Sequence, residues 1–296
     1  MNPLDFERWI AQEADLRRRT FRQAVHLVLR AIANEPVLAP LMVMKGGILL
    51  AIRYHSARFT RDIDFSTRRR IEDVDLTRFV DELDHSIRRV AADNEYGLAL
   101  AVQSHVLKPR ARTTPTFPTL QVTVGYADRA SRQEMRRLQA GEAPRTVQLD
   151  YSFNEWASEV EQHVLDGGTL TMYAYHDLIA EKLRAVLQQP IRQRSRFQDI
   201  YDLCLLLEHG EPDAADCLAI LDKLRAASCE RQVPMDPRAL RDPVLVALSR
   251  RGYAEVAALV PGTPPDFESS FATVRDFYER LPWNPPMGVP TSLSIP

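Results

Sequence analysis

Residues 41–66, LMVMKGGILLAIRYHSARFTRDIDFS, decide how the N-terminal half folds. A short apolar run ends in the glycine pair Gly46-Gly47, and GGILLAIRYH (46–55) has the pattern of a helix that opens at this turn. TRDIDFS (60–66) follows and alternates as a strand does, with successive side chains on opposite faces. The stretch therefore predicts strand, glycine turn, helix and strand in immediate succession.

The DID triplet places two carboxylates on one face of its strand. Asp62 and Asp64 point the same way, while Ile63 and Phe65 enter the core. Two adjacent anions repel unless a cation joins them, and magnesium prefers oxygen ligands of this kind. An isolated DxD triplet is also common on half-exposed strands, so the triplet alone does not establish a metal site.

The glycine pair upstream favours the metal-site interpretation. The N–H groups of Gly46 and Gly47 can approach a phosphate without an intervening side chain, at the start of a helix. Four residues before or beside the acids add cationic and hydroxyl groups, namely Arg53, Arg58, Thr60 and Arg61. Together these residues predict a pocket for phosphate and metal.

The rest of the N-terminal part reads as an α+β domain. Residues 4–33 and 72–92 have helical periodicity, and 98–107 and 119–127 resemble strands joined by the loop 108–118. RTVQLDYSF (145–153) alternates with one buried face, and Asp150 belongs to its polar face. We expect this strand and TRDIDFS to be neighbours in one mixed sheet, with Asp150 beside Asp62 and Asp64.

From about residue 173 the strand patterns stop and helical patterns run to the end of the chain. The predicted helices span 175–189, 196–208, 213–227, 237–250 and 266–281. We therefore predict an α+β domain with an N-terminal helix over 1–172 and a helical domain over 173–296. The proline-rich tail from Trp283 is expected to be irregular.

A second polar group lies in these helices. Lys182 falls within the apolar arc of its helix, where an ammonium needs an anionic partner or must extend to water. Asp199 and Asp202 share the one polar face of the next helix. A buried structural pair between the lysine and these acids is the alternative to a role in ligand binding.

Composition limits the class of protein. The chain has 296 residues, 45% of them hydrophobic, and a formal net charge of −2, so it can build real cores and shows no overall bias towards polyanions. Three cysteines without CxxC spacing fit neither a disulfide framework nor a zinc site. No signal peptide or membrane span is recognisable, which predicts a cytoplasmic protein.

In combination, the motifs resemble the nucleotidyltransferase AbiEii/AbiGii toxin family, over roughly residues 42 to 207. The matching order is KGGxxL, RxxRDID, a lone strand aspartate, EKLxA and an arginine-rich link into DxxDL. The resemblance implies a polymerase-β-like nucleotidyltransferase fold, a nucleoside triphosphate (NTP) donor and one or two Mg²⁺ ions.

The resemblance also implies roles for individual residues. Gly46 and Gly47 would hold the triphosphate, and Thr60, Arg61 and Arg196 would lie near the nucleotide. The remaining roles fall to the charged residues: Asp62, Asp64 and Asp150 as metal ligands, Lys182 as the lysine on the nucleotide phosphates, and Asp199 as the essential acid of the last motif. Asp150 could instead be the base for an acceptor hydroxyl.

Two positions depart from the family pattern. Ile48 stands where a threonine often follows the glycines, which would remove one phosphate contact. Gln198 stands where a cation commonly precedes the acid, so that Arg192, Arg194 or Arg196 would have to supply the charge. Neither departure affects a predicted metal ligand.

The resemblance further implies a toxin of a toxin–antitoxin or abortive-infection system, with a cognate antitoxin and, for some relatives, the 3′ end of tRNA as acceptor. Several arginine clusters would suit an RNA backbone, and a solvated protein surface is the alternative interpretation of each: Arg68-Arg69-Arg70, Arg88-Arg89, Arg110 to Arg112 and Arg136-Arg137. A protein hydroxyl or a small molecule are the alternative acceptors, and a non-catalytic binding module of the same fold is the alternative class.

Overall fold

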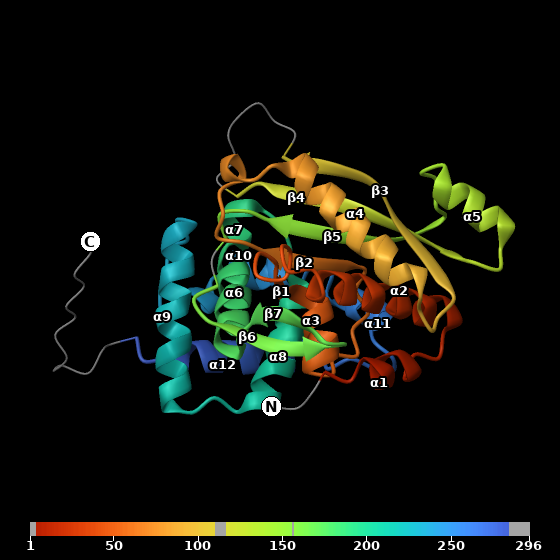
Figure 1. Cartoon of the computed structure of the whole chain (residues 1–296). Coiled ribbons are helices and arrows are strands. Elements are labelled where there is room, and N and C mark those ends of the chain that lie inside the picture. Colours follow the sequence, from red (N-terminus) through yellow and green to blue (C-terminus); the bar gives the residue numbers. More distant parts are fainter. Residues whose placement is uncertain (1–3, 110–116, 156, 284–296) are drawn as a thin grey trace. The chain divides into compact units, whose positions relative to one another are not determined.

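A computed structural model describes residues 4–109, 117–155 and 157–283 of the chain (Figure 1). It divides into two compact units, the first made of residues 1–178 and 257–264 and the second of residues 179–256 and 265–296. This division concerns compactness and not independent folding, so the predicted domain boundary after residue 172 stays a prediction. The predicted cluster at Arg110 to Arg112 and the tail after Trp283 lie outside the described residues.

The first unit is built on a mixed sheet, which has seven strands in the described part of the chain, in the order β3-β4-β5-β2-β1-β7-β6. The strands are β1 (Val43–Lys45), β2 (Asp62–Ser66), β3 (Leu98–Lys108), β4 (Thr119–Asp128), β5 (Arg145–Ser152), β6 (Val160–Leu165) and β7 (Gly168–Tyr173). β2 pairs in parallel with β5 and antiparallel with β1. The prediction that TRDIDFS and RTVQLDYSF are neighbouring strands of one mixed sheet is therefore confirmed.

Helices cover the apolar face of this sheet. The ring of Tyr151 on β5 stacks on Phe79 of α4 (Leu76–Ala92), with ring centroids 5.0 Å apart, and Phe65 of β2 is fully buried beside Tyr151 in the strand register. α2 (Leu16–Ala33) packs beside α4, where the Ser86 hydroxyl donates to the Ala31 carbonyl. Alternation in β2 and β5 thus sends every second side chain into this core and leaves the acids on the other face.

Three further helices belong to the first unit: α1 (Phe6–Ala11), α3 (Gly46–Arg53) and α5 (Arg132–Gln139). α3 begins at the glycine pair, as the sequence predicts. The single helical region expected over residues 4–33 is instead two helices, because the Asp15 side chain accepts a hydrogen bond from the Arg18 N–H and caps the start of α2.

The second unit is helical. Its helices, two of which begin or end in the first unit, are α6 (Tyr175–Leu187), α7 (Gln189–Arg192), α8 (Phe197–Gly210), α9 (Ala214–Glu230), α10 (Pro243–Arg250), α11 (Val256–Leu259) and α12 (Phe267–Arg280). The short 3₁₀ turns are Ile71–Asp73 in the first unit, and Ala239–Arg241 and Tyr253–Glu255 in the second.

A mixed sheet followed by helices confirms the predicted α+β class. None of the described helices combines the length and apolar character that a membrane crossing requires.

The alternation in β2 makes a direct prediction about stability. Phe65→Ala should lower the free energy of unfolding by about 3–5 kcal/mol, because it empties a fully buried ring site. Asp62→Ala, three residues away on the opposite face, should change it by no more than about 0.5 kcal/mol, because the side chain is exposed. Urea unfolding of both variants followed by circular dichroism measures the difference, and equal losses would contradict the strand orientation.

Candidate active site

The glycine turn and the DID strand are in direct contact. Gly46 has φ 77°, a conformation that glycine adopts without steric cost. A Cβ atom built on Gly46 would lie 2.0 Å from Oδ2 of Asp64. The carboxylate of Asp64 therefore occupies the space that any other residue at position 46 would fill, and the structure brings these two predicted site residues together.

The second glycine lies against the segment that leads into β2. A Cβ atom on Gly47 would lie 3.0 Å from Nη2 of Arg58 and 3.0 Å from Cγ2 of Thr60. Arg58 is buried, whereas Arg61 is exposed. Arg53, grouped with them in the sequence analysis, instead pairs with Glu161 of β6 at 2.5 Å. The turn is thus lined by Arg58 and Thr60 on one side and by Asp64 on the other.

The three predicted metal ligands lie on neighbouring strands and on one face of the sheet. Asp64 is the register partner of Asp150, and Asp62 is the partner of Gln148. The side-chain amide of Gln121, on β4, donates to Oδ1 of Asp150 at 2.9 Å and fixes that carboxylate. Strand neighbours lie about 4.8 Å apart, so the backbone positions of these acids suit a shared cation.

The electrostatics of Asp62 reflect this crowding. Although the Asp62 side chain reaches solvent, the surrounding protein partly desolvates it, and this desolvation raises the pKa of Asp62 above its ordinary value. The negative charge of Asp150 raises it further. The positive charges of Arg61 and Lys108 lower the pKa of Asp62 and so partly oppose these two effects. A divalent cation would relieve both the desolvation and the repulsion, so the carboxylates have the donor chemistry that magnesium prefers.

The carboxylates do not form a ready-made metal centre in this structure. In the described residues, no three or more His, Cys, Asp or Glu side chains are gathered closely enough to hold a metal ion. The three-carboxylate ligand set therefore stays a prediction. Its support is the chemistry of the donors and their positions on one face of two neighbouring strands.

Lys45 lies beside the predicted site, and the sequence motifs assigned it no role. It immediately precedes the glycines, and it is the register partner of Asp64 on β1. Its Nζ lies 2.5 Å from Oε2 of Glu155 and 5.9 Å from the centroid of the Tyr173 ring. The available signal was its position, because Lys45 ends a short strand directly before the glycine turn that is predicted to bind phosphate.

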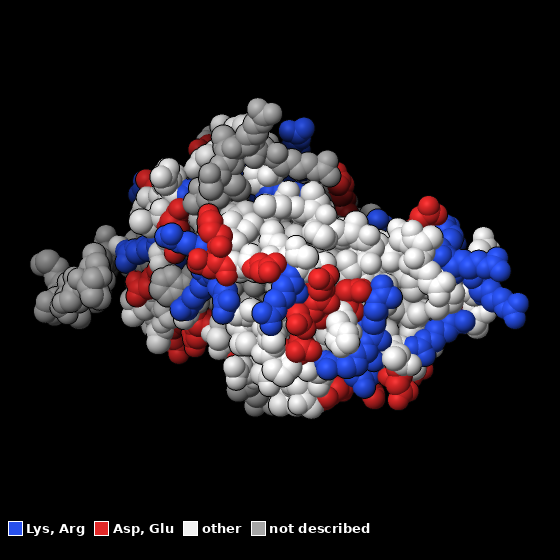
Figure 2. All heavy atoms as spheres, turned by 45° about the horizontal axis from the view of Figure 1, so that its top comes forward, with Lys and Arg blue, Asp and Glu red and all other residues white. Residues whose placement is uncertain are grey.

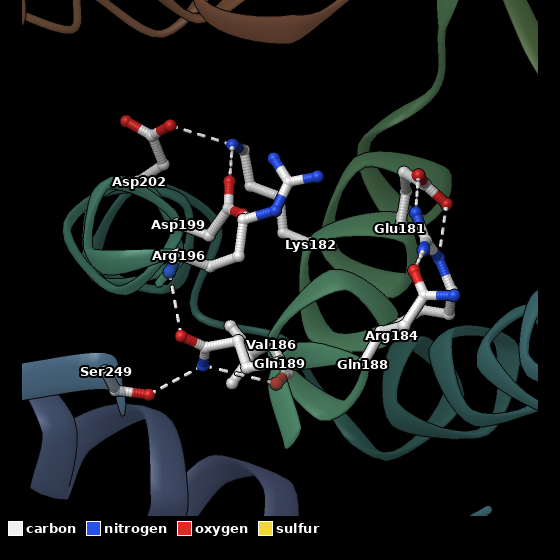
Figure 3. A network of polar contacts seen from close by, with 10 residues as sticks. All are labelled: Glu181, Lys182, Arg184, Val186, Gln188, Gln189, Arg196, Asp199, Asp202 and Ser249. Carbon is white, nitrogen blue, oxygen red and sulfur yellow. Dashed lines mark hydrogen bonds and ion pairs between the residues drawn. The ribbon is translucent and has the colours of Figure 1, made fainter. Parts of the chain in front are cut away.

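The second unit holds a buried network around Lys182 (Figure 3). The Lys182 ammonium donates to Oδ1 of Asp199 at 2.9 Å and to Oδ2 of Asp202 at 2.7 Å. Asp202 is fully buried, and Asp199 is 9% exposed. The pairing of Lys182 with Asp199 that the helical pattern suggested is present, and Asp202 joins it.

Asp199 differs from Asp202 in one respect. Its Oδ2 is buried and has no hydrogen bond within the described residues, although Nε of Arg196 lies 3.9 Å away. The Arg196 backbone is held in turn, because its N–H donates to Oε1 of Gln189 at 2.7 Å and the Gln189 amide donates to the Ser249 hydroxyl (Figure 3). Asp199 thus presents an unused acceptor next to an arginine whose main chain is fixed. The predicted convergence of this network with Asp62 and Asp64 stays a prediction.

Comparisons with known proteins address identity. The search of curated proteins returned no match. The crystal structure of JHP933 from Helicobacter pylori superposes with a TM-score of 0.52 at 19% identity, covering 90% of this chain and 92% of that one. A second H. pylori structure, described as a candidate nucleotidyltransferase, gives a TM-score of 0.49 at 16% identity, with 90% and 94% covered. The likeness to JHP933 concerns the fold alone.

The family comparison is decisive. The family model described as nucleotidyl transferase AbiEii toxin, Type IV TA system, matches residues 27–280, which is most of the chain and includes both the glycine turn and the Lys182 network. The chain therefore belongs to the AbiEii family of type IV toxin–antitoxin systems and is a nucleotidyltransferase.

Proposed function

We propose that this toxin transfers a nucleotide from an NTP to an RNA acceptor, the 3′ end of a tRNA, with magnesium held at Asp62, Asp64 and Asp150. One observation carries the proposal: the Asp64 carboxylate lies against Gly46, which supports a single site made of the turn proposed to bind phosphate and the strand proposed to bind metal. The tRNA acceptor is proposed because the family resemblance implies it for some relatives. The cognate antitoxin that the family implies would block this transfer.

The reaction sets clear demands on the site. The acceptor hydroxyl attacks the α-phosphorus, the bond from that phosphorus to the β-phosphate oxygen breaks, pyrophosphate leaves, and the hydroxyl proton passes to a base. Magnesium, when bound, would neutralise charge on the phosphates and lower the pKa of the attacking hydroxyl. Asp150, whose carboxylate accepts a hydrogen bond from Gln121, would complete the ligand set or take the proton.

The chain's own residues would supply the remaining parts. The N–H groups of Gly46 and Gly47 would donate to the triphosphate at the start of α3, with Thr60 and Arg61 near the nucleotide. Lys182 and Arg196 would stabilise the leaving pyrophosphate, as a point charge and as a fork of donors. Asp199 and Asp202 hold the Lys182 ammonium in one position, which reduces the entropy lost when it meets a phosphate.

Four labelled NTPs, each incubated with the protein and total tRNA with magnesium or with a chelator, would test the proposal. We expect label to appear at RNA 3′ ends for at least one nucleotide, only with magnesium. Label that appears on protein or on a small molecule, with none on RNA, would overturn the acceptor. Turnover that persists in chelator would overturn the metal requirement.

The carboxylates of β2 provide the first mutational prediction. Asp62→Asn and Asp64→Asn should each reduce transfer by at least about 10³-fold, because each removes an ionised oxygen ligand while keeping the side-chain volume. Asp81→Asn, at an exposed position on α4, is the matched control and should retain wild-type activity. Single-turnover transfer measures the effect, and an active Asp64→Asn protein would refute the mechanism.

Gly46 provides the second mutational prediction. Gly46→Ala should abolish transfer, because its Cβ would displace the Asp64 carboxylate, at a stability cost of about 1–2 kcal/mol for the positive φ. Gly97→Ala carries the same kind of strain, φ 65°, but has nothing within 4 Å of the added Cβ. This control should lose similar stability and keep its activity. Equal activities in the two variants would show that the contact with Asp64 does not matter.

The buried network around Lys182 provides the third mutational prediction. Asp199→Asn should reduce transfer by at least about 10²-fold while Asp202 still holds the Lys182 ammonium, so the loss of unfolding free energy should stay moderate. Asp202→Asn disturbs a fully buried ion pair and should mainly lower stability, by about 3 kcal/mol or more. Thermal unfolding and transfer rates of both variants separate these roles. The reverse ranking would make Asp199 structural.

A further inference from the structure

We propose that the arginine-bearing surface of α5 binds the phosphate backbone of the RNA acceptor, away from the reacting end; this inference rests on the proposed function. The helix lies in the connection between β4 and β5, the two strands that carry Gln121 and Asp150. The α5 surface is defined here by four exposed arginines: Arg129, Arg132, Arg136 and Arg137.

The helix is attached to the face of the sheet that carries the acids. Leu138 of α5 packs with Ala127 of β4 and Ala101 of β3 in a small apolar cluster. Ala127 lies six residues after Gln121 on the same strand, so the two side chains point to one face. The amide of Gln103 donates to the Leu138 carbonyl at 3.1 Å and secures the packing. α5 and the carboxylates therefore share one surface of the first unit.

The charges of α5 are available to a ligand. In the described residues, none of the four arginines of the α5 surface takes part in an ion pair. Figure 2 shows basic side chains gathered at the right-hand end of the molecule, where α5 lies in Figure 1. Of the acids nearby, Glu134 pairs with Arg145, and Asp128 accepts a hydrogen bond from the Ala130 N–H. The arginines of α4 behave differently, because Arg88 and Arg89 are paired with acids.

Geometry and charge favour a long polyanion that also reaches the active site. From Asp150 to the start of β5 at Arg145, whose own side chain points to the other face, the strand covers about 17 Å. A ligand that follows the Asp150 face towards α5 would therefore extend over on the order of five nucleotide steps. The side chains on this face between them are neutral, namely Thr123, Gln148 and Thr146. Arg132 and Arg136 lie about 6 Å apart along the helix, which suits successive phosphates of one strand. An RNA acceptor must reach the active-site carboxylates, and the neutral side chains leave its phosphates a route without further negative charge. An acidic protein that bound only the α5 surface would not require such a route.

The experiment compares two triple variants with the same change in charge. Arg132→Gln/Arg136→Gln/Arg137→Gln alters the α5 surface, and Arg78→Gln/Arg88→Gln/Arg89→Gln alters exposed arginines of α4, which covers the other face of the sheet. The probe is a labelled RNA hairpin with a single-stranded 3′ end. Its affinity for each full-length protein is measured by fluorescence anisotropy between about 50 and 200 mM salt, without NTP.

The α5 variant should bind the hairpin about tenfold or more weakly than the wild type, with the slope of log K against log salt reduced by about 2. The α4 variant should match the wild type. In transfer assays the α5 variant should show a raised KM for the acceptor and an unchanged kcat.

Two results would overturn the inference: no RNA binding by the wild type, or equal affinity and slope in the α5 variant. If the α5 variant binds RNA normally but resists the antitoxin, the surface serves an acidic protein instead. If the wild type binds the hairpin through α5 but transfers no nucleotide to any RNA, the proposed function is contradicted, whereas RNA binding by the α5 surface is still supported.

Discussion

The close approach of Gly46 to Asp64 is the constraint on which the rest of the site depends. A side chain at position 46 would occupy the place of the Asp64 carboxylate, and the backbone there has a positive φ. β1 and β2 can therefore pair with Lys45 opposite Asp64 while the helix that follows β1 opens beside the acid. Because β2 also pairs with β5, the same contact fixes where Asp150 lies relative to the turn.

Charge is balanced differently in the two units. On the sheet, Asp62 and Asp150 repel each other, and this leaves the site short of positive charge, a deficit that a metal ion would meet. In the helical unit, two buried carboxylates share the Lys182 ammonium, and Oδ2 of Asp199 has no hydrogen bond within the described residues. The lysine is consequently both a structural residue and a candidate catalytic one, and its simple removal would leave two buried acids without their cation.

Local signals account for the elements that sequence reasoning missed. The β6–β7 hairpin turns at Asp166-Gly167, an Asp-Gly pair with positive φ at both positions, which is a strong hairpin signal. α5 begins at Ser131, whose side chain accepts from the Glu134 N–H in the manner of a helix cap. Both signals were present in the sequence. They were short, and neither adjoined a motif with chemistry.

The sequence by itself determined which side of its strand each acid faces, because alternation has a period of two, and it determined that a helix opens at Gly46. It also carried the motifs that resemble the family, all of which lie within the residues that the family model matches. Only the tertiary structure decided that β2 lies between β1 and β5, that Lys45 meets Glu155, and that α5 packs on the face with the acids. Strand order and side-chain pairs between distant segments arise from long-range packing, and the periodicity of a single segment contains no information about its partners.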